Sequence, residues 1–462
     1  MKQYPAYPAY KTTGCDWFPE IPSHWGIDRA KWSISSCQNG VWGAEPDGDD
    51  DLVCIRVADF DRQSLRVSTE KLTMRSIAEK DRRNRLLNNG DLLLEKSGGG
   101  EQQLVGAVVE FNQPFPAVNS NFIARMVASD GMNSRFLVYL HSHLYSGRVN
   151  FRSIKQTTGI QNLDSQVYLD EPITYPPLDE QQAIARFLNF KTAQIDALIA
   201  KKKSLLGKLA EKRTALISHA VTKGLDSSVA MKDSGVAWLG KIPAHWAIDR
   251  AKWSISSCQN GVWGGEPDGD DDLVCIRVAD FDRQSLRVST EKLTMRSIAE
   301  KDRRNRLLNN GDLLLEKSGG GEHQLVGTVV EFNQPFPAVN SNFIARMVVS
   351  DDSDPRFLVY LHSHLYAGRV NYRSIKQTTG IQNLDSQSYL NESLAYPPLE
   401  EQKVIGKFLD DVSARMDVQK ELINAVIDRL MEYRSALVTN AVTGKIDVRG
   451  FEISQSAEGI AS

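Results

Sequence analysis

Cysteine is scarce in this chain, and long apolar runs are missing. The 462 residues hold five cysteines and no C-x-x-C pair: Cys15, Cys37, Cys54, Cys258 and Cys275. An odd number without paired spacing is typical of reduced, buried thiols in a cytoplasmic protein. No run reaches the roughly 18 apolar residues of a membrane-spanning helix, and the N-terminal residues lack the apolar core of a signal peptide. We therefore expect a cytoplasmic protein with no membrane association.

An excess of charge of either sign is also missing. The chain has 55 Lys and Arg against 58 Asp and Glu, a formal net charge of -3. A nonspecific nucleic-acid coat would be strongly basic, so any contact with DNA must come from local basic clusters. The length allows two or three domains, each with its own core.

Catalytic motifs are imitated in several places, but none is complete. Lys96-Ser97 precedes its three glycines, whereas a phosphate loop needs glycines before Lys-Ser. Glu95 and Lys96 are adjacent, so on a strand they point to opposite faces and cannot form a nuclease cluster with Asp91. Leu52 and Ala58 stand where a calcium loop beginning at Asp47 would need Gly and Glu, so we interpret that stretch as a solvated acidic loop.

Histidines and prolines give no catalytic centre either. His141 and His143 are two apart on a predicted helix and cannot chelate from one face, so we interpret them as packing or cap residues. The prolines after Tyr175 lack the preceding Asn or Asp of an amino-methyltransferase motif, and no glycine-rich cofactor signature occurs in a strand-to-helix setting. We expect no catalytic residue, no metal and no cofactor in this chain.

One unit is written twice. Aligning Trp25 with Trp246 gives an offset of 246 - 25 = 221, and the offset holds nearly from end to end. A repeat of about 220 residues is too long for a solenoid, so it is a tandem duplication of a globular part followed by a helix. The globular parts are near copies with scattered differences, such as Gln102 against His323, whereas the helices diverge widely.

Two stretches, residues 178–217 and 399–437, carry heptad spacing. In the first, one heptad position holds Leu188, Ile195, Lys202, Leu209 and Leu216, and the other holds Ile184, Lys191, Leu198, Leu205 and Lys212. In the second, the positions hold Leu409, Met416, Ile423, Leu430 and Leu437, and Ile405, Val412, Gln419, Val426 and Tyr433. Each stretch spans roughly 60 Å of helix, longer than one small domain can cover. We predict an antiparallel coiled coil; two helices, each packed on its own domain, remain the alternative.

Within each unit the pattern is mixed α/β. Residues 54–57, 65–67, 91–96, 104–111 and 121–127 read as strands, and residues 76–87 and 135–146 as helices. Tyr175-Pro176-Pro177 ends the pattern before the long helix. The fold class is therefore α+β, with two globular parts in tandem. The expected domains are 1–177, a helix at 178–225, a second globular part at 226–398, a helix at 399–447 and a tail at 448–462.

Three polar clusters in each unit suit nucleic acid, because Arg and Lys bind phosphates or guanine edges and Gln and Asn suit adenine. Taken alone, each cluster is a weak signal, because a run of charged residues is more often a solvated face. The candidates in the first unit are Arg82, Arg83, Arg85, Lys96, Ser97, Gln102, Arg152, Lys155, Gln156, Thr157, Thr158, Gln161 and Asn162. The candidates in the second unit are Arg303, Arg304, Arg306, Lys317, Ser318, His323, Arg373, Lys376, Gln377, Thr378, Thr379, Gln382 and Asn383.

Several of these strings resemble the specificity subunits of Type I restriction-modification systems. The matching residues are the KDSGV run at Lys232, the I-P-x-H-W runs at Ile21 and Ile242, G-D-L-L at Gly90, P-P-L-D-E-Q at Pro176 and A-V-T-G-K-I-D at Ala441. The resemblance covers essentially the whole chain. It implies two target recognition domains that each bind half of a bipartite double-stranded DNA site, held apart by the two helices with pseudo-two-fold symmetry.

The same resemblance implies partners. They would be two methyltransferase subunits, which use S-adenosylmethionine, and two restriction subunits, which use ATP. Family members commonly carry two different recognition domains, whereas these are near copies, so we hypothesise an interrupted palindrome with matching half-sites. The competing hypotheses are a stand-alone symmetric DNA-binding protein and the recognition half of a fused enzyme; a recently recombined gene with a weakly active product also stays open.

Overall fold

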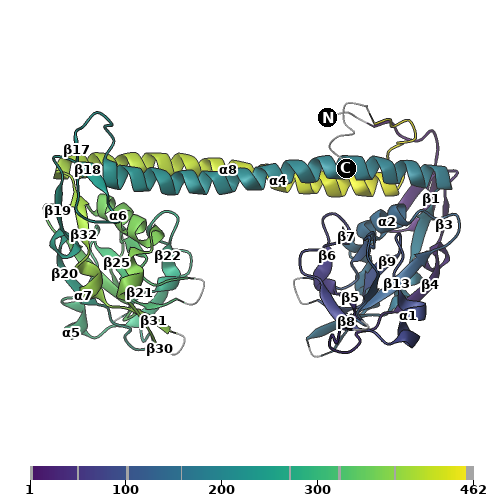
Figure 1. Ribbon diagram of the computed structural model, residues 1–462, viewed down its shortest axis with the longest axis horizontal. Helices are drawn as coiled ribbons and strands as arrows, with labels where there is room; N and C mark the ends of the chain where they lie inside the picture. Colours follow the sequence, from purple (N-terminus) through teal and green to yellow (C-terminus); the bar gives the residue numbers. More distant parts are fainter. Residues whose placement is uncertain are drawn as a thin grey trace. The chain divides into compact units, whose positions relative to one another are not determined.

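Two structural units share the chain, and each takes residues from both long helices. The computed structural model describes residues 4–48, 51–99, 103–157, 159–269, 272–320, 324–378 and 381–453. Unit 1 comprises Met1–Lys203 and Asn424–Ser462, and unit 2 comprises Ser204–Ile423. Each unit therefore contains one globular part, half of the first long helix and the opposite half of the second (Figure 1).

The globular part of unit 1 is built on a six-stranded mixed sheet of order β4-β13-β9-β11-β7-β6, with a three-stranded sheet β12-β5-β8 beside it. A second three-stranded sheet, β10-β15-β14, is antiparallel throughout, and the pairs β1-β2 and β16-β3 complete the part. The strands are β1 (Tyr10–Cys15), β2 (Phe18–Pro22), β3 (Gly26–Arg29), β4 (Ile34–Asn39), β5 (Asp51–Ile55), β6 (Phe60–Asp61), β7 (Arg66–Val67), β8 (Thr73–Ser76), β9 (Leu92–Glu95), β10 (Ser97–Gly98), β11 (Val108–Glu110), β12 (Ala117–Asn119), β13 (Ile123–Ala128), β14 (Ile154–Thr157), β15 (Ile160–Leu163) and β16 (Pro172–Tyr175).

Unit 2 repeats this topology. Its sheets have the orders β20-β29-β25-β27-β23-β22, β24-β21-β28, β26-β31-β30, β17-β18 and β19-β32. The strands are β17 (Met231–Asp233), β18 (Lys241–Pro243), β19 (Ala247–Arg250), β20 (Ile255–Asn260), β21 (Asp272–Ile276), β22 (Phe281–Asp282), β23 (Arg287–Val288), β24 (Thr294–Ser297), β25 (Leu313–Glu316), β26 (Ser318–Gly319), β27 (Val329–Glu331), β28 (Ala338–Asn340), β29 (Ile344–Val349), β30 (Ile375–Thr378), β31 (Ile381–Leu384) and β32 (Ser393–Tyr396).

The short helices begin where side chains cap them. In α2 (Ser134–Ser146) the side chain of Asn133 accepts from Phe136 N at 2.9 Å, which satisfies one free N–H of the first turn. In α3 (Ser165–Leu169) Asp164 does the same. The equivalents in unit 2 are α6 (Pro355–Ala367) and α7 (Ser386–Leu390). The mixed α/β prediction, including the helix at 135–146, is confirmed.

The predicted helix at residues 76–87 is wrong at both ends. Ser76 ends strand β8, where it pairs with Asp51, and Leu87 N donates to Ala117 O. The helix α1 therefore covers only Glu79–Arg85, and its copy α5 only Glu300–Arg303. The flanking residues bond to neighbouring strands and therefore lie outside the helix.

The long helices are α4 (Leu178–Lys223) and α8 (Leu399–Val442), and both are uninterrupted. In unit 1, Arg434 Nε of α8 lies 3.0 Å from Asp196 Oδ1 of α4. In unit 2, Arg213 NH1 of α4 lies 2.8 Å from Asp417 Oδ1 of α8. The start of each helix thus packs beside the end of the other, as an antiparallel pair requires. No helix among the described residues is long and apolar enough to cross a membrane.

The seam between the long helices differs from the predicted one by one residue. The position of Ile195 and Met416 is buried as expected. At the second predicted position Ile184 and Ile405 are buried, but the prediction is wrong further along the helices: Leu198 is 47% exposed and Leu205 is 44% exposed, whereas Ile199 and Ile427 are buried. Leucine spacing alone allows the second seam position to lie either three or four residues after the first. Leu198 and Leu205, which lie on the solvent side, favoured the three-residue step.

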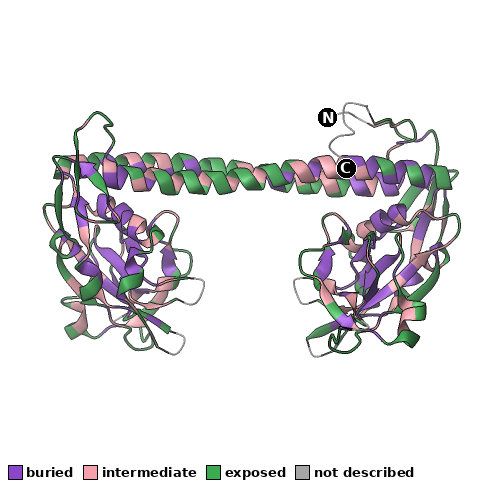
Figure 2. Ribbon diagram, in the orientation of Figure 1, coloured by how far each residue is buried: buried purple, intermediate pink, exposed green. Residues whose placement is uncertain are grey.

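Each core continues from the sheet into the long helices. In unit 2, Ile217 and Val221 of α4 and Ile405 and Leu409 of α8 belong to the same apolar cluster as the strands and α6. Figure 2 shows this burial within each globular part and in the helix segments beside it. The prediction of free thiols is confirmed, but only Cys54 and Cys275 are buried, while Cys15 and Cys258 are half-buried and Cys37, on β4, is exposed.

Candidate nucleic-acid interface

The small sheet β10-β15-β14 joins two of the three polar clusters. Ser97 is paired with Asn162, which is paired with Lys155 across the next strand. Residues directly opposite one another share a face of a sheet, and Asn162 and Lys155 are exposed. Ser97 Oγ donates to Asn162 Oδ1 at 2.6 Å. We call Lys96, Ser97, Lys155 and Asn162 the reading face of unit 1.

Asn39, at the end of β4, links the third cluster to this face. Its Oδ1 accepts from Lys96 Nζ at 2.8 Å, and its backbone carbonyl accepts from the Arg85 guanidinium. The next residue must be glycine, because a Cβ at Gly40 would collide with the carbonyl oxygen of Asn119. Asn39 thus binds both Arg85, from α1, and Lys96, which follows β9.

Unit 2 reproduces this geometry. Ser318 Oγ lies 2.5 Å from Asn383 Oδ1, and Lys317 Nζ lies 2.8 Å from Asn260 Oδ1. The reading face of unit 2 is Lys317, Ser318, Lys376 and Asn383. Figure 1 shows that α5, β30 and β31 lie at the end of this globular part away from α8. The polar face is therefore at the free end of the globular part.

A second site in each unit fixes the globular part to the helix pair. In unit 1, Asp196 Oδ1 accepts from Gln63 Nε2 at 2.8 Å and from Arg434, and Arg434 also donates to the carbonyl of Gln63. We call these three residues the Arg–Asp–Gln clamp; its copy in unit 2 is Arg213, Asp417 and Gln284. Since each clamp joins both long helices to one loop, it sets the register of the helices and the position of the part.

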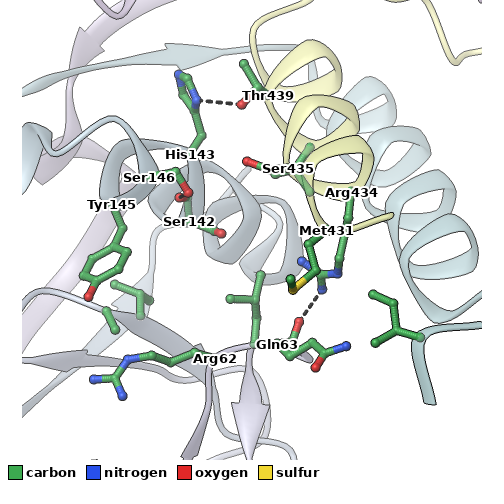
Figure 3. Close-up of a pocket in the computed structure, with 15 residues that line it drawn as sticks. Arg62, Gln63, Ser142, His143, Tyr145, Ser146, Met431, Arg434, Ser435 and Thr439 are labelled. Carbon is green, nitrogen blue, oxygen red and sulfur yellow. Dashed lines mark hydrogen bonds between the residues drawn. The ribbon is translucent and has the colours of Figure 1, made fainter. Parts of the chain in front are cut away.

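A cavity of about 380 Å³ adjoins the clamp of unit 1, between α2 and the end of α8 (Figure 3). His143 faces Thr439 across it, with Nδ1 3.2 Å from Oγ1. Burial lowers the pKa of His143, so the ring is neutral at pH 7. Its partner is a threonine of the helix rather than Ser142 or Ser146, which also line the cavity, so the geometry is that of a packed interface.

Two stretches of the chain, residues 66–206 and 287–427, match the family model described as Type I restriction modification DNA specificity domain. The second match begins 221 residues after the first, since 287 - 66 = 221, so the matches coincide with the repeat. The chain belongs to this family. It is a specificity subunit with two DNA-recognition domains, and such subunits are not the catalytic members of their system.

Curated relatives agree. The chain is 23% identical to the Type I restriction enzyme StySPI specificity subunit of Salmonella potsdam over 361 residues, which is 77% of this chain and 74% of that protein. It is 20% identical to the EcoKI specificity subunit of Escherichia coli K12, over 77% and 75% of the two chains. A chain from a solved type I restriction-modification system has the same fold, with a TM-score of 0.62, 16% identity, and coverage of 91% of this chain and 98% of that chain.

The arginines of α1 in this specificity subunit, and their copies in unit 2, differ in how firmly other groups hold their guanidinium groups. Arg82 and Arg303 donate to the carbonyls of Ile77 and Ile298, so they also hold the local backbone. Arg83 of α1 and Arg304, which follows α5, are exposed, and the ion pair that each makes is with the glutamate four residues earlier. Exposed pairs of this kind are weak, so these two guanidinium groups can exchange the glutamate for a phosphate.

Gln161 and Gln382 are corrections to the candidate set. They are 3% and 4% exposed, and each Oε1 accepts from a backbone N–H, that of Val105 at 3.1 Å and that of Val326 at 3.2 Å. Alternation along β15 and β31 turns them inward and the neighbouring Asn162 and Asn383 outward. They shape the loop beside the reading face and do not face a ligand.

Arg152 also lies apart from the reading face. Its guanidinium carbon is 4.4 Å from the centre of the Trp17 ring, and its NH2 is 3.9 Å from Asp16 Oδ2, both in the turn between β1 and β2. Arg373 is exposed and lines a hollow with Trp238, the equivalent of Trp17. Gln156 is exposed on β14. Gln102, His323, Thr158 and Thr379, and the side chains of Thr157, Gln377 and Thr378, lie outside the described residues.

The carboxylates near the reading face are each tied to a basic side chain. Asp164 Oδ2 accepts from Lys155 Nζ of the reading face at 3.1 Å, an exposed pair that a phosphate can replace. Asp91 Oδ2 accepts from Arg125 Nε at 2.6 Å, and Glu95 Oε2 accepts from Arg62 NH2 at 2.7 Å. Burial raises the pKa of Glu95, and Arg62 opposes this effect. As expected, Glu95 points into the core while Lys96 points to Asn39, so the two do not form a nuclease cluster.

Asn39 and Asn260 were missed by the sequence analysis. A single asparagine before a glycine is typical of any turn, and its role depends on Lys96 and Arg85, which are distant in the sequence. A usable signal was the identity of the two copies around it. Residues 27–127 and 248–348 differ at three positions only: Ala44 and Gly265, Gln102 and His323, and Ala107 and Thr328.

Proposed function

We propose that this specificity subunit reads an interrupted palindrome, with one reading face on each half-site. The observation that supports the proposal is the sameness of the two faces. Their residues are identical, and the Ser–Asn and Lys–Asn distances agree within 0.1 Å between units. Equal donors and acceptors in equal positions select equal base edges.

The charge of the face suits the two tasks of such a site. Lys96, Lys155 and the α1 arginines carry the positive charge that phosphates require, and Asn162 offers an amide able to pair with adenine. We propose that residues 1–177 and 226–398 form the two recognition domains. Residues 178–225 and 399–447 would form the helical spacers, and residues 448–462 the tail. We also propose DNA contacts for Arg83, Arg85, Lys96, Ser97, Lys155 and Asn162, with their copies in unit 2. Gln156 is exposed but lies on the opposite face of β14 from Lys155, because it pairs with Gln161, so its proposed contact would come from outside the reading face.

The specificity subunit acts within a type I restriction-modification complex. We further propose two methyltransferase subunits, which supply S-adenosylmethionine-dependent adenine methylation, and two restriction subunits, which supply ATP-dependent cleavage, working in the cytoplasm. Native mass spectrometry of the complex assembled with DNA tests this stoichiometry. A single methyltransferase subunit per chain would contradict it.

The decisive experiment is a map of methyladenine across the genome, with and without the gene for this chain. The expected result is one gene-dependent motif whose two halves are reverse complements separated by unspecified bases. An asymmetric motif would rule out the palindrome. Binding of the isolated chain to the mapped site with the affinity of the full complex would instead favour a stand-alone DNA-binding protein.

Paired variants sharpen the test. Asn162→Ala should relax one base of one half-site, and Asn383→Ala should relax the corresponding base of the other half-site, each by about 1–3 kcal/mol. Lys155→Ala and Lys376→Ala should weaken binding to all sequences and reduce its salt dependence. Variants of Asn162 and Asn383 that relax different bases would contradict matching half-sites.

A further inference from the structure

An apolar cleft opens beside the reading face of unit 2. It has a volume of about 440 Å³ and is lined by Trp263, Val278, Ala279, Ser318, Gly319 and Phe343, among others. Trp263 follows β20, Val278 begins a 3-10 helix (Val278–Asp280), and Phe343 lies in the turn between β28 and β29. Three loops distant in the sequence thus make one cleft, and β26 of the reading face is one of its walls.

The aromatic walls are exposed, yet they are held in place. Phe343 is 48% exposed and Trp263 is 37% exposed. The backbone carbonyl of Phe343 accepts from the N–H groups of Lys317, at 2.8 Å, and Ser318, at 3.2 Å. The guanidinium carbon of Arg296 lies 4.2 Å from the centre of the Trp263 ring. The phenyl ring is therefore presented to solvent at a fixed place beside two residues of the reading face.

Unit 1 carries the same arrangement. Phe122 is 50% exposed, Trp42 is 37% exposed, and Arg75 covers Trp42 at 4.4 Å. Lys96 N and Ser97 N donate to Phe122 O at 2.8 and 3.2 Å. In both copies the exposed phenylalanine and the tryptophan lie beside the reading face.

We propose that Phe122 and Phe343 each contact the 5-methyl group of a thymine, one in each half-site. This inference rests on the proposed function. The thymine methyl is the apolar group that base edges present in the major groove, and Phe is among the side chains that contact it. Lys317 flanks the cleft, and both Lys317 and Arg306 donate to Asn260. Phosphates on either side of the base therefore meet positive charge.

The size of the effect follows from the group that is buried. One methylene-sized apolar group removed from water contributes about 0.8 kcal/mol, which is about fourfold in affinity. Each half-site should therefore contain a thymine whose methyl group changes the affinity about fourfold. The two thymines should occupy equivalent positions, because Phe122 and Phe343 lie in the same place beside their reading faces.

The test uses the full chain with its methyltransferase subunits and a duplex that carries the mapped site. Each thymine of the half-sites is replaced in turn by deoxyuridine, which removes the methyl group and keeps the pairing edge. The expected result is one sensitive position in each half-site. Phe343→Ala should abolish the sensitivity in one half-site, Phe122→Ala should abolish it in the other, and Phe343→Leu should retain it.

Trp253→Ala is the matched control. Trp253 is an exposed aromatic residue, 63% exposed, that does not line the cleft, so this variant should keep the full uracil sensitivity. Three results would overturn the inference. They are a half-site without thymine, no sensitive position, or a Phe343→Ala variant that loses the same affinity for thymine and uracil sites and so keeps the difference between them. The last is expected of a ring that inserts between bases.

The two proposals fail in distinguishable ways. Specific binding without a uracil-sensitive thymine would overturn the thymine contact and leave the proposed function intact. A complex that shows no preference for any DNA sequence would overturn the proposed function, and the thymine contact with it.

Discussion

Units 1 and 2 present the same reading face but are closed in different ways. In unit 2, residues 224–230 run as continuous chain from the end of α4 to the next strand. In unit 1 the same place is filled by two segments distant in the sequence, residues 4–10 and 443–451. Asp447 N donates to Pro5 O at 2.7 Å, and Tyr10 OH donates to Gly444 O at 3.0 Å.

Aromatic and acidic groups hold these two segments on unit 1. The Phe451 ring meets Phe187 edge-on, with centroids 4.9 Å apart. Glu180 is 5% exposed and accepts from Tyr7 OH, at 3.0 Å, and from Trp25 Nε1, at 2.9 Å. Its copy Glu401 accepts from Trp246 and bonds His245, and no tyrosine of the described segments bonds it. The reading parts were thus kept alike while their attachments diverged.

The largest effects are expected from variants of the helix seam, which compare its part in unit 1 with its part in unit 2. Ile195→Ala in unit 1 and Met416→Ala in unit 2 each remove a buried seam side chain and should lower the free energy of unfolding by about 3 kcal/mol. Leu198→Ala, at an exposed position, should change it by less than about 0.5 kcal/mol. Urea unfolding checks this prediction. An effect of Leu198→Ala as large as that of Ile195→Ala would restore the seam expected from the sequence.

Acid should weaken both units alike. Burial lowers the pKa of His141 and His362 to about 4, below the unfolded value of 6.5. The unfolded chain therefore takes up these protons first, and stability falls as the pH drops from about 6.5 toward 4. The loss should reach about 2 kcal/mol per histidine at pH 5 and about 3 kcal/mol at pH 4.

Hydrogen exchange at pH 7 and pH 5, followed by peptide, measures this loss for each unit. His141→Gln should flatten the pH dependence of unit 1 and leave that of unit 2, while His362→Gln should do the reverse. If either variant keeps the wild-type pH dependence, burial of the imidazole is not the cause.

The closure of the units gives a smaller difference. Glu180→Ala leaves the buried Trp25 N–H and the Tyr7 hydroxyl without an acceptor and should cost about 2 kcal/mol in unit 1. Glu401→Ala should cost about 1 kcal/mol in unit 2, because Glu401 has fewer partners and is more exposed. Thermal unfolding with peptide-resolved exchange compares them. Glu180→Gln, which keeps an acceptor oxygen, is the control, and equal costs in both units would remove the distinction.

The smallest difference lies beside the clamp. Arg283 Nε donates to Thr328 Oγ1 at 3.1 Å, whereas Ala107 at the corresponding place of unit 1 has no hydroxyl. Thr328→Ala should cost about 1 kcal/mol, and Ala107→Thr should stabilise unit 1 by a similar amount. The two variants are compared by urea unfolding. A neutral Thr328→Ala would show that the ion pair of Arg283 with Glu316 is sufficient.

The sequence by itself determined the duplication, the mixed α/β class, the two long helices and their antiparallel pairing. These follow from the repeat offset, the apolar periodicity and the prolines after Tyr175, all of which can be read from the sequence without knowing which elements are in contact. It also placed Lys96 and Ser97 among the candidates, because the residue types that contact DNA are few.

Only the tertiary structure decided which of two neighbouring residues faces outward. Asn162 and Gln161 are equally good base-reading side chains in the sequence, and the pairing of β15 with β10 buries the second. Leu198 and Ile199 are equally apolar, and the packing of α8 on α4 selects Ile199. The side a residue faces is set by the element that pairs with it, and those partners are distant in the sequence.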